Sequence, residues 1–336
     1  MTDGPSVLIP HLLSRQFSPE YARSVHDALT DRLPDLDVTL AESEAASLEA
    51  VVDADIVVCK GITPALLDRA ERLGWIQGLS SGLQRFTDDE YVTGYEPPGL
   101  DRLREEGIVL TNVAGIHAEP AGEQVLGYML AFERNLHRAV RAQVEREWGG
   151  YGGAYGELVD KRLAVVGVGA IGGRVAQLGA ALGMTVVGTK RDPTTVPDAV
   201  DEIYGPEELD AAVADADYVA VTCPLTDETR GLIDGDAFET MRDDAVLVNV
   251  ARGAVVDEDA LVEALDSGEI RGAALDVFAE EPLPTDSPLW DDENVLVTPH
   301  MAGGSPRSNE RVAELFARNY QRFREGAFDG FENRIV

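Results

Sequence analysis

The segment "RLAVVGVGAIGGRVAQLGAALG", residues 162–183, decides how the fold of this 336-residue chain is interpreted. An apolar stretch typical of a buried strand leads through Gly167, Gly169 and Gly172 into a stretch with the apolar spacing of a helix. In this context the spacing G-x-G-x-x-G predicts a dinucleotide site. The first glycine permits a tight turn, the second lets a pyrophosphate approach the backbone, and the third lets the helix pack closely. The alternative is an ordinary strand–helix turn whose glycines serve packing alone.

The next expected strand, "MTVVGT" at residues 184–189, is followed by cations where a dinucleotide site usually has an acid. Such an acid accepts hydrogen bonds from the adenosine ribose hydroxyls, and here its position falls on Lys190. Lys190 can pair with a 2′-phosphate instead, Arg191 can add bidentate contacts, and Thr189 can donate a hydrogen bond. These residues predict a preference for NADP(H), with NAD(H) also accepted. Asp192 is the rival candidate for the ribose, and a solvated loop is the alternative to any contact.

Short apolar runs alternate with amphipathic segments along most of the chain, which predicts parallel sheets covered by helices. The fold class is therefore α/β with two doubly wound parallel-sheet domains, the second inserted in the first. Strands are expected at 6–11, 37–41, 55–61, 75–81 and 107–112, and then at 162–169, 184–189, 217–223, 245–251, 273–278 and 294–300. Helices are expected at 18–33 and 63–73, as one long stretch at 120–147, and near 306–326, where the chain should return to the first domain.

The chain is acidic along its whole length, with 61 Asp and Glu against 28 Lys and Arg and a formal net charge of −33. A dispersed negative surface repels nucleic acid and anionic membranes, so neither is an expected partner. Many acids and very few lysines indicate a protein of a salt-accumulating halophile, with an ordinary acidic bacterial protein as the alternative. We expect no signal peptide and no apolar span of ~18 residues. Cys59 and Cys223 lie in strand-like runs, which favours reduced core thiols and a cytoplasmic location.

Several separated motifs resemble those of one enzyme family. The segments "VNVARGAVVDEDALVEAL" (248–265), "GAALDVFAEEPLP" (272–284) and "VLVTPHMAGGS" (295–305) are similar to signature segments of the D-isomer-specific 2-hydroxyacid dehydrogenases. "CPLTDETRGLID" (223–234) and "TNVAGIHAEPAGEQVLGYML" (111–130) match further stretches of that family. The resemblance implies a Rossmann dinucleotide-binding domain inserted into a flavodoxin-like substrate domain. The expected boundaries are 1–118 for the first part of the substrate domain, 119–301 for the inserted domain and 302–336 for the return.

The resemblance also implies a catalytic triad, which falls on Arg252, Glu281 and His300. The residue types suit the reduction of a 2-ketoacid, because a guanidinium fork binds a carboxylate in two contacts. Hydride arriving at the ketone carbon leaves negative charge on oxygen, and a histidine can supply the proton. A nearby carboxylate favours the imidazolium and orients it. Each residue also has an ordinary alternative, as a surface arginine, one acid among many, or a packing histidine.

Further contacts are carried over from the family to matching positions. Asp276 would bind the nicotinamide carboxamide, and Arg252 would hold the substrate carboxylate together with the backbone of a loop in the first domain. That loop is Ser81, Gly82 and Leu83, followed by Gln84 where the family usually has an acid or Asn. The expected cofactor-lining residues are Gly167, Gly169, Ala170, Ile171, Gly172, Thr189, Lys190, Arg191, Cys223, Pro224, Val250, Ala251 and Asp276. No metal site is expected.

These patterns together predict a cytoplasmic, homodimeric reductase of small 2-ketoacids to D-2-hydroxyacids, reversible and using NADPH in preference to NADH. The resemblance places the dimer contact on the inserted domain and the helical stretch at 120–147. One alternative is a dinucleotide-sensing corepressor with the same fold and triad, which would need a groove for a partner. Another is an NAD-dependent phosphoglycerate dehydrogenase, which often has an added regulatory domain.

Overall fold

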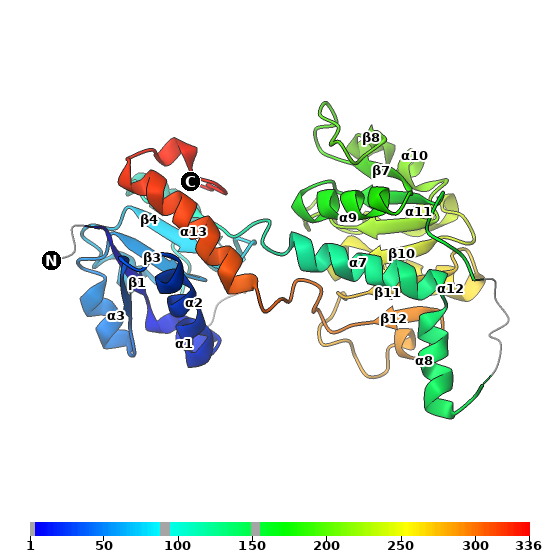
Figure 1. Ribbon diagram of the computed structural model, residues 1–336, viewed down its shortest axis with the longest axis horizontal. Coiled ribbons are helices and arrows are strands. Elements are labelled where there is room, and N and C mark those ends of the chain that lie inside the picture. The colour runs from blue at the N-terminus through cyan, green and yellow to red at the C-terminus, as the bar shows by residue number, and fades with distance from the viewer. Residues whose placement is uncertain (1–3, 88–94, 149–154) are drawn as a thin grey trace. The chain divides into compact units, whose positions relative to one another are not determined.

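The computed structural model describes residues 4–87, 95–148 and 155–336. The chain forms two compact units, one made of Met1–Ile116 with Pro306–Val336 and the other of His117–Ser305. Each unit is built on one parallel β-sheet with helices along the chain between its strands (Figure 1). The predicted α/β class with two doubly wound parallel sheets is confirmed.

The first unit has a five-stranded parallel sheet in the order β2-β1-β3-β4-β5, which is the flavodoxin-like order. Its strands are β1 (Ser6–Ile9), β2 (Asp37–Leu40), β3 (Ile56–Cys59), β4 (Trp75–Gly78) and β5 (Val109–Thr111). Its helices are α1 (His11–Gln16), α2 (Pro19–Arg32), α3 (Glu44–Ala50), α4 (Pro64–Leu67), α5 (Gln84–Thr87), α6 (Gly99–Glu105) and α13 (Ser308–Arg324). The C-terminal helix α13 belongs to this unit because its buried face packs on α2 and the sheet, where Phe316 stacks on Trp75 with ring centroids 4.9 Å apart.

The second unit has a seven-stranded parallel sheet in the order β12-β11-β10-β9-β6-β7-β8. From β8 to β11 this is the doubly wound Rossmann order, with β12 added at the edge. Its strands are β6 (Arg162–Val166), β7 (Thr185–Thr189), β8 (Glu202–Tyr204), β9 (Tyr218–Val221), β10 (Val246–Asn249), β11 (Gly272–Leu275) and β12 (Val295–Val297). Its helices are α7 (Ala118–Glu133), α8 (Leu136–Glu145), α9 (Ala170–Ala181), α10 (Leu209–Val213), α11 (Gly235–Thr240) and α12 (Glu258–Ser267).

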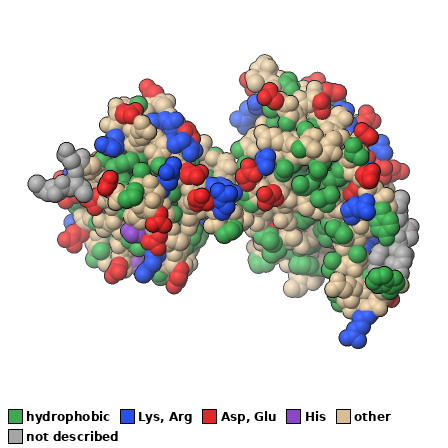
Figure 2. Space-filling view, in the orientation of Figure 1, with side chains coloured by type: hydrophobic (Ala, Val, Ile, Leu, Met, Phe, Trp, Pro, Cys, Tyr) green, Lys and Arg blue, Asp and Glu red, His purple; other side chains and the backbone are tan. Residues whose placement is uncertain are grey.

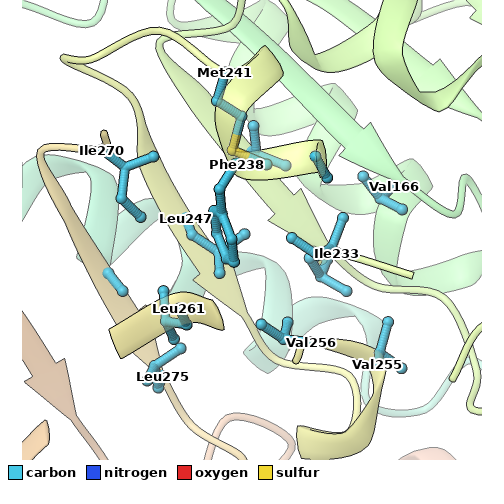
Figure 3. Close-up of a cluster of buried hydrophobic side chains, with 14 of the residues drawn as sticks. Val166, Ile233, Phe238, Met241, Leu247, Val255, Val256, Leu261, Ile270 and Leu275 are labelled. Atoms are coloured by element: carbon cyan, nitrogen blue, oxygen red, sulfur yellow. The ribbon is translucent and has the colours of Figure 1, made fainter. Parts of the chain in front are cut away.

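Local sequence signals account for many of the boundaries. Helix α12, for example, starts after Asp257, whose side chain accepts a hydrogen bond from Ala260 N, and ends at Gly268 with φ 76°. The central strands are buried on both faces, as expected for a sheet covered on each side. On one face the side chains of α11, α12 and the sheet converge on Phe238, which is fully buried (Figure 3).

Three local expectations were wrong. The helical stretch at 120–147 is two helices, α7 and α8, because Asn135 takes the left-handed conformation (φ 51°) between them. The helix expected at 63–73 is only α4, Pro64–Leu67. The short edge strand β8, Glu202–Tyr204, was not expected at all, since its three residues show no apolar alternation long enough to detect.

Acidic and basic side chains are interspersed on the visible face of each unit (Figure 2). Within the described residues, no helix is both long enough and apolar enough to cross a bilayer. Cys59 and Cys223 are buried and unpaired. Burial raises the pKa of the Cys59 thiol to about 12 and that of Cys223 to about 11, which keeps both thiols protonated.

Candidate active site

The three motif glycines have three different surroundings at the start of α9. Gly167 has φ +96°, and a Cβ there would lie 2.6 Å from the Cα of Cys223. A Cβ at Gly172 would lie 2.4 Å from the carbonyl oxygen of Gly167, so the helix can approach the strand only with glycine. Gly169, which precedes the first turn of α9, has open space where its Cβ would be. A tight turn, close packing and an open backbone beside a helix N-terminus fit the pyrophosphate of a dinucleotide.

The last residue of β7 and the residues that follow it lie beside this loop. The Thr189 side chain is buried, and its Oγ1 accepts a hydrogen bond from Gly167 N at 3.1 Å, so Thr189 supports the glycine turn. Lys190 is half-buried and its N–H donates to Tyr204 O of β8 at 3.0 Å, whereas Arg191 is exposed. Asp192 Oδ1 accepts from the backbone N and the hydroxyl of Thr194 at 3.1 and 2.6 Å. These bonds lower the pKa of Asp192 and direct its carboxylate toward its own turn.

The other expected lining residues follow strands at the same edge of the sheet. Cys223 and Pro224 come after β9, and Val250 and Ala251 come after β10. Since β6, β9 and β10 are parallel neighbours, their carboxyl ends open on one edge together with Ala170 and Ile171 of α9.

Arg252 is exposed and follows β10 in a turn that the Asn249 side chain holds. Asn249 Nδ2 donates to Arg252 O at 3.1 Å, and its Oδ1 accepts from Ala251 N at 3.0 Å. The next residue must be small, because a Cβ at Gly253 would lie 1.8 Å from the carbonyl carbon of Phe278. The turn therefore fixes the Arg252 backbone and leaves its guanidinium at the surface, where it bonds only to Ala251 O among the described residues.

Glu281 and His300 form a hydrogen-bonded pair, with His300 Nδ1 2.7 Å from Glu281 Oε2. The other carboxylate oxygen of Glu281 accepts from Phe278 N at 3.1 Å, which fixes the carboxylate toward the histidine. About half of the His300 side chain (49%) is exposed. With Nδ1 facing the carboxylate, the second ring nitrogen, Nε2, is left for a ligand.

Arg252, Glu281 and His300 follow β10, β11 and β12, which are adjacent parallel strands. The structure therefore gathers the expected triad at the edge that carries the glycine loop. Ser81, Gly82 and Leu83 follow β4 in the other unit, where Ser81 O accepts a hydrogen bond from Asn112 Nδ2 at 2.8 Å.

Asp276 is almost fully buried (1% exposed) and its carboxylate already accepts several hydrogen bonds. Met301 N donates to Oδ1 at 2.9 Å and Ala302 N to Oδ2 at 2.7 Å. Thr298 Oγ1 also donates to Oδ1, and the Tyr128 hydroxyl bonds to Thr298 in turn. Sequence reasoning missed Tyr128 and Thr298. Across the described residues, no group of three or more His, Cys, Asp and Glu side chains is placed to hold a metal.

Comparison with known proteins decides the family. The sequence pattern of the D-isomer specific 2-hydroxyacid dehydrogenase NAD binding domain matches residues 126–302, which is more than half of the chain. The chain belongs to the D-isomer specific 2-hydroxyacid dehydrogenases. As a member of this oxidoreductase family it contains an NAD-binding domain in the second unit.

Relatives of this dehydrogenase cover several activities. It is 37% identical over 226 residues to the glyoxylate/hydroxypyruvate reductase B of Pectobacterium atrosepticum, covering 66% of this chain and 70% of that protein. It is 32% identical over 304 residues to the D-3-phosphoglycerate dehydrogenase of Methanocaldococcus jannaschii, covering 89% of this chain but only 55% of that longer protein. Among solved structures, the NADPH-dependent glyoxylate/hydroxypyruvate reductase of Sinorhizobium meliloti, in complex with NADP and sulfate, superimposes with a TM-score of 0.77. The identity in that comparison is 27%, and 98% of each chain is covered.

Proposed function

We propose that this dehydrogenase reduces short 2-ketoacids to D-2-hydroxyacids reversibly, with NADPH as the preferred coenzyme and NADH accepted less well. The observation that carries the proposal is the His300–Glu281 pair at 2.7 Å, on the same sheet edge as Arg252 and the Gly167–Gly172 turn. Two relatives named as glyoxylate/hydroxypyruvate reductases support a small ketoacid as substrate.

In the proposed reaction His300 is the general acid. The Glu281 carboxylate accepts a hydrogen bond from Nδ1–H and orients the ring, while Nε2–H donates its proton to the ketone oxygen. The pair is substantially exposed, so solvent can return the proton to the imidazole after each turnover. In the reverse direction the neutral imidazole accepts the hydroxyl proton.

Arg252 would bind the substrate carboxylate and polarise the neighbouring carbonyl, since its guanidinium offers several donors in a plane. The backbone N–H groups of Ser81, Gly82 and Leu83 would contribute further donors from the substrate domain. When bound, the nicotinamide would supply or accept the hydride. Asp276 retains acceptor capacity on Oδ2, which accepts one hydrogen bond from the described residues, and the carboxamide would use it.

The coenzyme preference rests on the residues after β7. Lys190 and Arg191 would bind the 2′-phosphate, while Asp192 is engaged by Thr194 and is a poor competitor for the ribose. Thr189 would contribute indirectly, because its hydroxyl oxygen accepts a hydrogen bond from Gly167 N and so holds the glycine turn in place. The Sinorhizobium meliloti reductase is NADPH-dependent, which supports the same preference here.

The direct test is a panel of glyoxylate, hydroxypyruvate, pyruvate and longer 2-ketoacids, each with NADPH and with NADH, at molar salt. Chiral chromatography of the product then reports its configuration. The proposal fails if no 2-ketoacid is reduced, or if the product of a chiral reduction is the L-hydroxyacid.

A second candidate is phosphoglycerate dehydrogenase, because the Methanocaldococcus jannaschii relative matches 89% of this chain. Oxidation of 3-phosphoglycerate with NAD would distinguish it. A rate with 3-phosphoglycerate above that with every unphosphorylated hydroxyacid would favour this second function.

We propose that the enzyme is a homodimer joined through the second unit. Helix α8 supports this, since Leu136, Val140 and Val144 recur at every fourth position on an exposed apolar stripe. Sedimentation of Val140→Asp would show monomers if this stripe is the contact.

A cytoplasmic, high-salt environment is proposed on the same basis as before, from two buried free thiols and a net charge of −33.

A further inference from the structure

The loop that carries His300 is folded around the side chain of Asp276. Thr298 Oγ1 and Met301 N donate to one carboxylate oxygen, and Ala302 N donates to the other at 2.7 Å. In addition, His300 N donates to the carbonyl oxygen of Asp276 at 2.8 Å. Four bonds thus connect the segment 298–302 to this one buried residue at the end of β11.

The chain of hydroxyls that leads to this carboxylate has a defined direction. An ionised carboxylate only accepts hydrogen bonds, so Thr298 must direct its hydroxyl proton to Asp276. The Thr298 oxygen can then only accept from the Tyr128 hydroxyl. Tyr128 lies on α7 with 4% of its surface exposed, and burial raises the pKa of its phenol, so the donor stays protonated.

His300 has a backbone conformation that needs such support. Its φ is +50°, in the left-handed region that residues other than glycine adopt uncommonly, although Asn, Asp and His do so more often than the rest. The orientation of the imidazole toward Glu281, at 2.7 Å, depends on this conformation. Groups that fix the loop therefore fix the direction of the ring.

We propose that Tyr128 and Thr298 are positioning residues for His300: their hydroxyls orient the Asp276 carboxylate, which holds the loop in the geometry that the acid needs. The inference rests on the acid role proposed for His300. Neither hydroxyl touches a reacting atom in this account, and both act through Asp276.

Three variants separate positioning from mere packing. Tyr128→Phe and Thr298→Val each remove one hydroxyl and keep the side-chain shape, while Thr298→Ser keeps the hydroxyl. Loss of one buried hydrogen bond predicts a kcat about fivefold lower in the first two variants, with the KM for ketoacid and the Kd for NADPH within about twofold of wild type. Thr298→Ser should retain wild-type kcat. The double variant Tyr128→Phe/Thr298→Val should be no slower than Thr298→Val, because the two hydroxyls act in series.

Amide hydrogen exchange in the coenzyme-free protein supplies a readout that does not depend on activity. The Met301 and Ala302 amides should exchange about fivefold faster in Tyr128→Phe. The control is Ser47→Ala, which removes a buried hydroxyl that accepts a hydrogen bond from His11 N and donates one to Ser43 O in the first unit. That control should leave kcat and both amides unchanged.

Unchanged exchange at Met301 and Ala302 in Tyr128→Phe, or equal losses in Thr298→Ser and Thr298→Val, would overturn the inference. If wild type reduces no 2-ketoacid, the proposed function fails instead, and the exchange measurement still decides whether the hydroxyls hold the loop.

Discussion

Replacing Lys190 by Asp and Arg191 by Ser tests the source of the coenzyme preference. Lys190 is half-buried and its backbone is fixed to β8, so its contact with a 2′-phosphate should contribute somewhat more than an exposed pair. Arg191 is exposed, and its charge also acts on the Glu228 carboxylate. The hydrogen bond from Thr226 lowers the pKa of Glu228 most, and the charge of Arg191 lowers it further. We take about 1.5 kcal/mol for Lys190 and about 0.5 kcal/mol for Arg191. The sum, about 2 kcal/mol, corresponds to roughly 30-fold in kcat/KM for NADPH over NADH.

The assay is the ratio of kcat/KM for NADPH to that for NADH, measured for wild type and for the double variant at 0.2 M and 2 M KCl. The variant should prefer NADH, chiefly through the KM for coenzyme, and high salt should reduce the wild-type preference. A control with the same change of charge is Arg32→Asp/Arg69→Ser, which alters two exposed cations of the other unit. If the Lys190/Arg191 variant keeps the wild-type ratio, the two cations form only a solvated loop.

Three further outcomes are expected. Arg252→Lys keeps the charge but loses the planar guanidinium, so the KM for ketoacid should rise and kcat should fall, while the Kd for NADPH should change little. A change in NADPH affinity alone would contradict the proposed role of Arg252. The net charge of −33 should cause loss of activity or assembly in dilute buffer, with protection by molar KCl. The reason is that the distance over which charges repel falls from ~10 Å at 0.1 M salt to ~3 Å at 1 M. Full long-term activity without salt would refute the halophilic interpretation. Burial, and to a smaller extent the nearby charge of Arg85, lowers the pKa of Lys60 from 10.5 to about 8. The ¹³C-methylated amine of Lys60 should therefore titrate near pH 8 in NMR spectra, and the Lys60→Arg variant assigns its signal. Because the unfolded chain keeps that proton up to about pH 10.5, Lys60 should make folding more favourable as pH rises from 8 to 10.5; a midpoint above pH 10 would contradict this.

The architecture was predictable because parallel strands buried on both faces are nearly continuous runs of apolar residues, which are easily recognised in a sequence. Runs such as Val246–Asn249 are continuously apolar until they end in a polar residue, and the glycine spacing at 167–172 identifies the first strand of a Rossmann sheet. The break at Asn135 was missed because a single left-handed residue does not interrupt the apolar periodicity on either side of it.

The candidate active site was predictable only in part. Arg252, Glu281 and His300 follow strand ends and stand in family motifs, so their neighbourhood could be inferred. The roles of Thr189 and Tyr128 could not be, because each depends on a partner far away in sequence. In the sequence, Tyr128 looks like one more apolar position on the buried face of α7. Only the fold brings its hydroxyl to Thr298, which lies 170 residues later in the chain.

The central claim is that His300 protonates a 2-ketoacid during reduction by NADPH. The most direct measurement compares single-turnover reduction of glyoxylate by wild type and by His300→Ala, with NADPH binding checked separately by fluorescence. We predict NADPH affinity close to wild type and a chemical step slower by roughly 10²-fold or more in His300→Ala. A chemical step in His300→Ala within a few-fold of wild type would contradict the account.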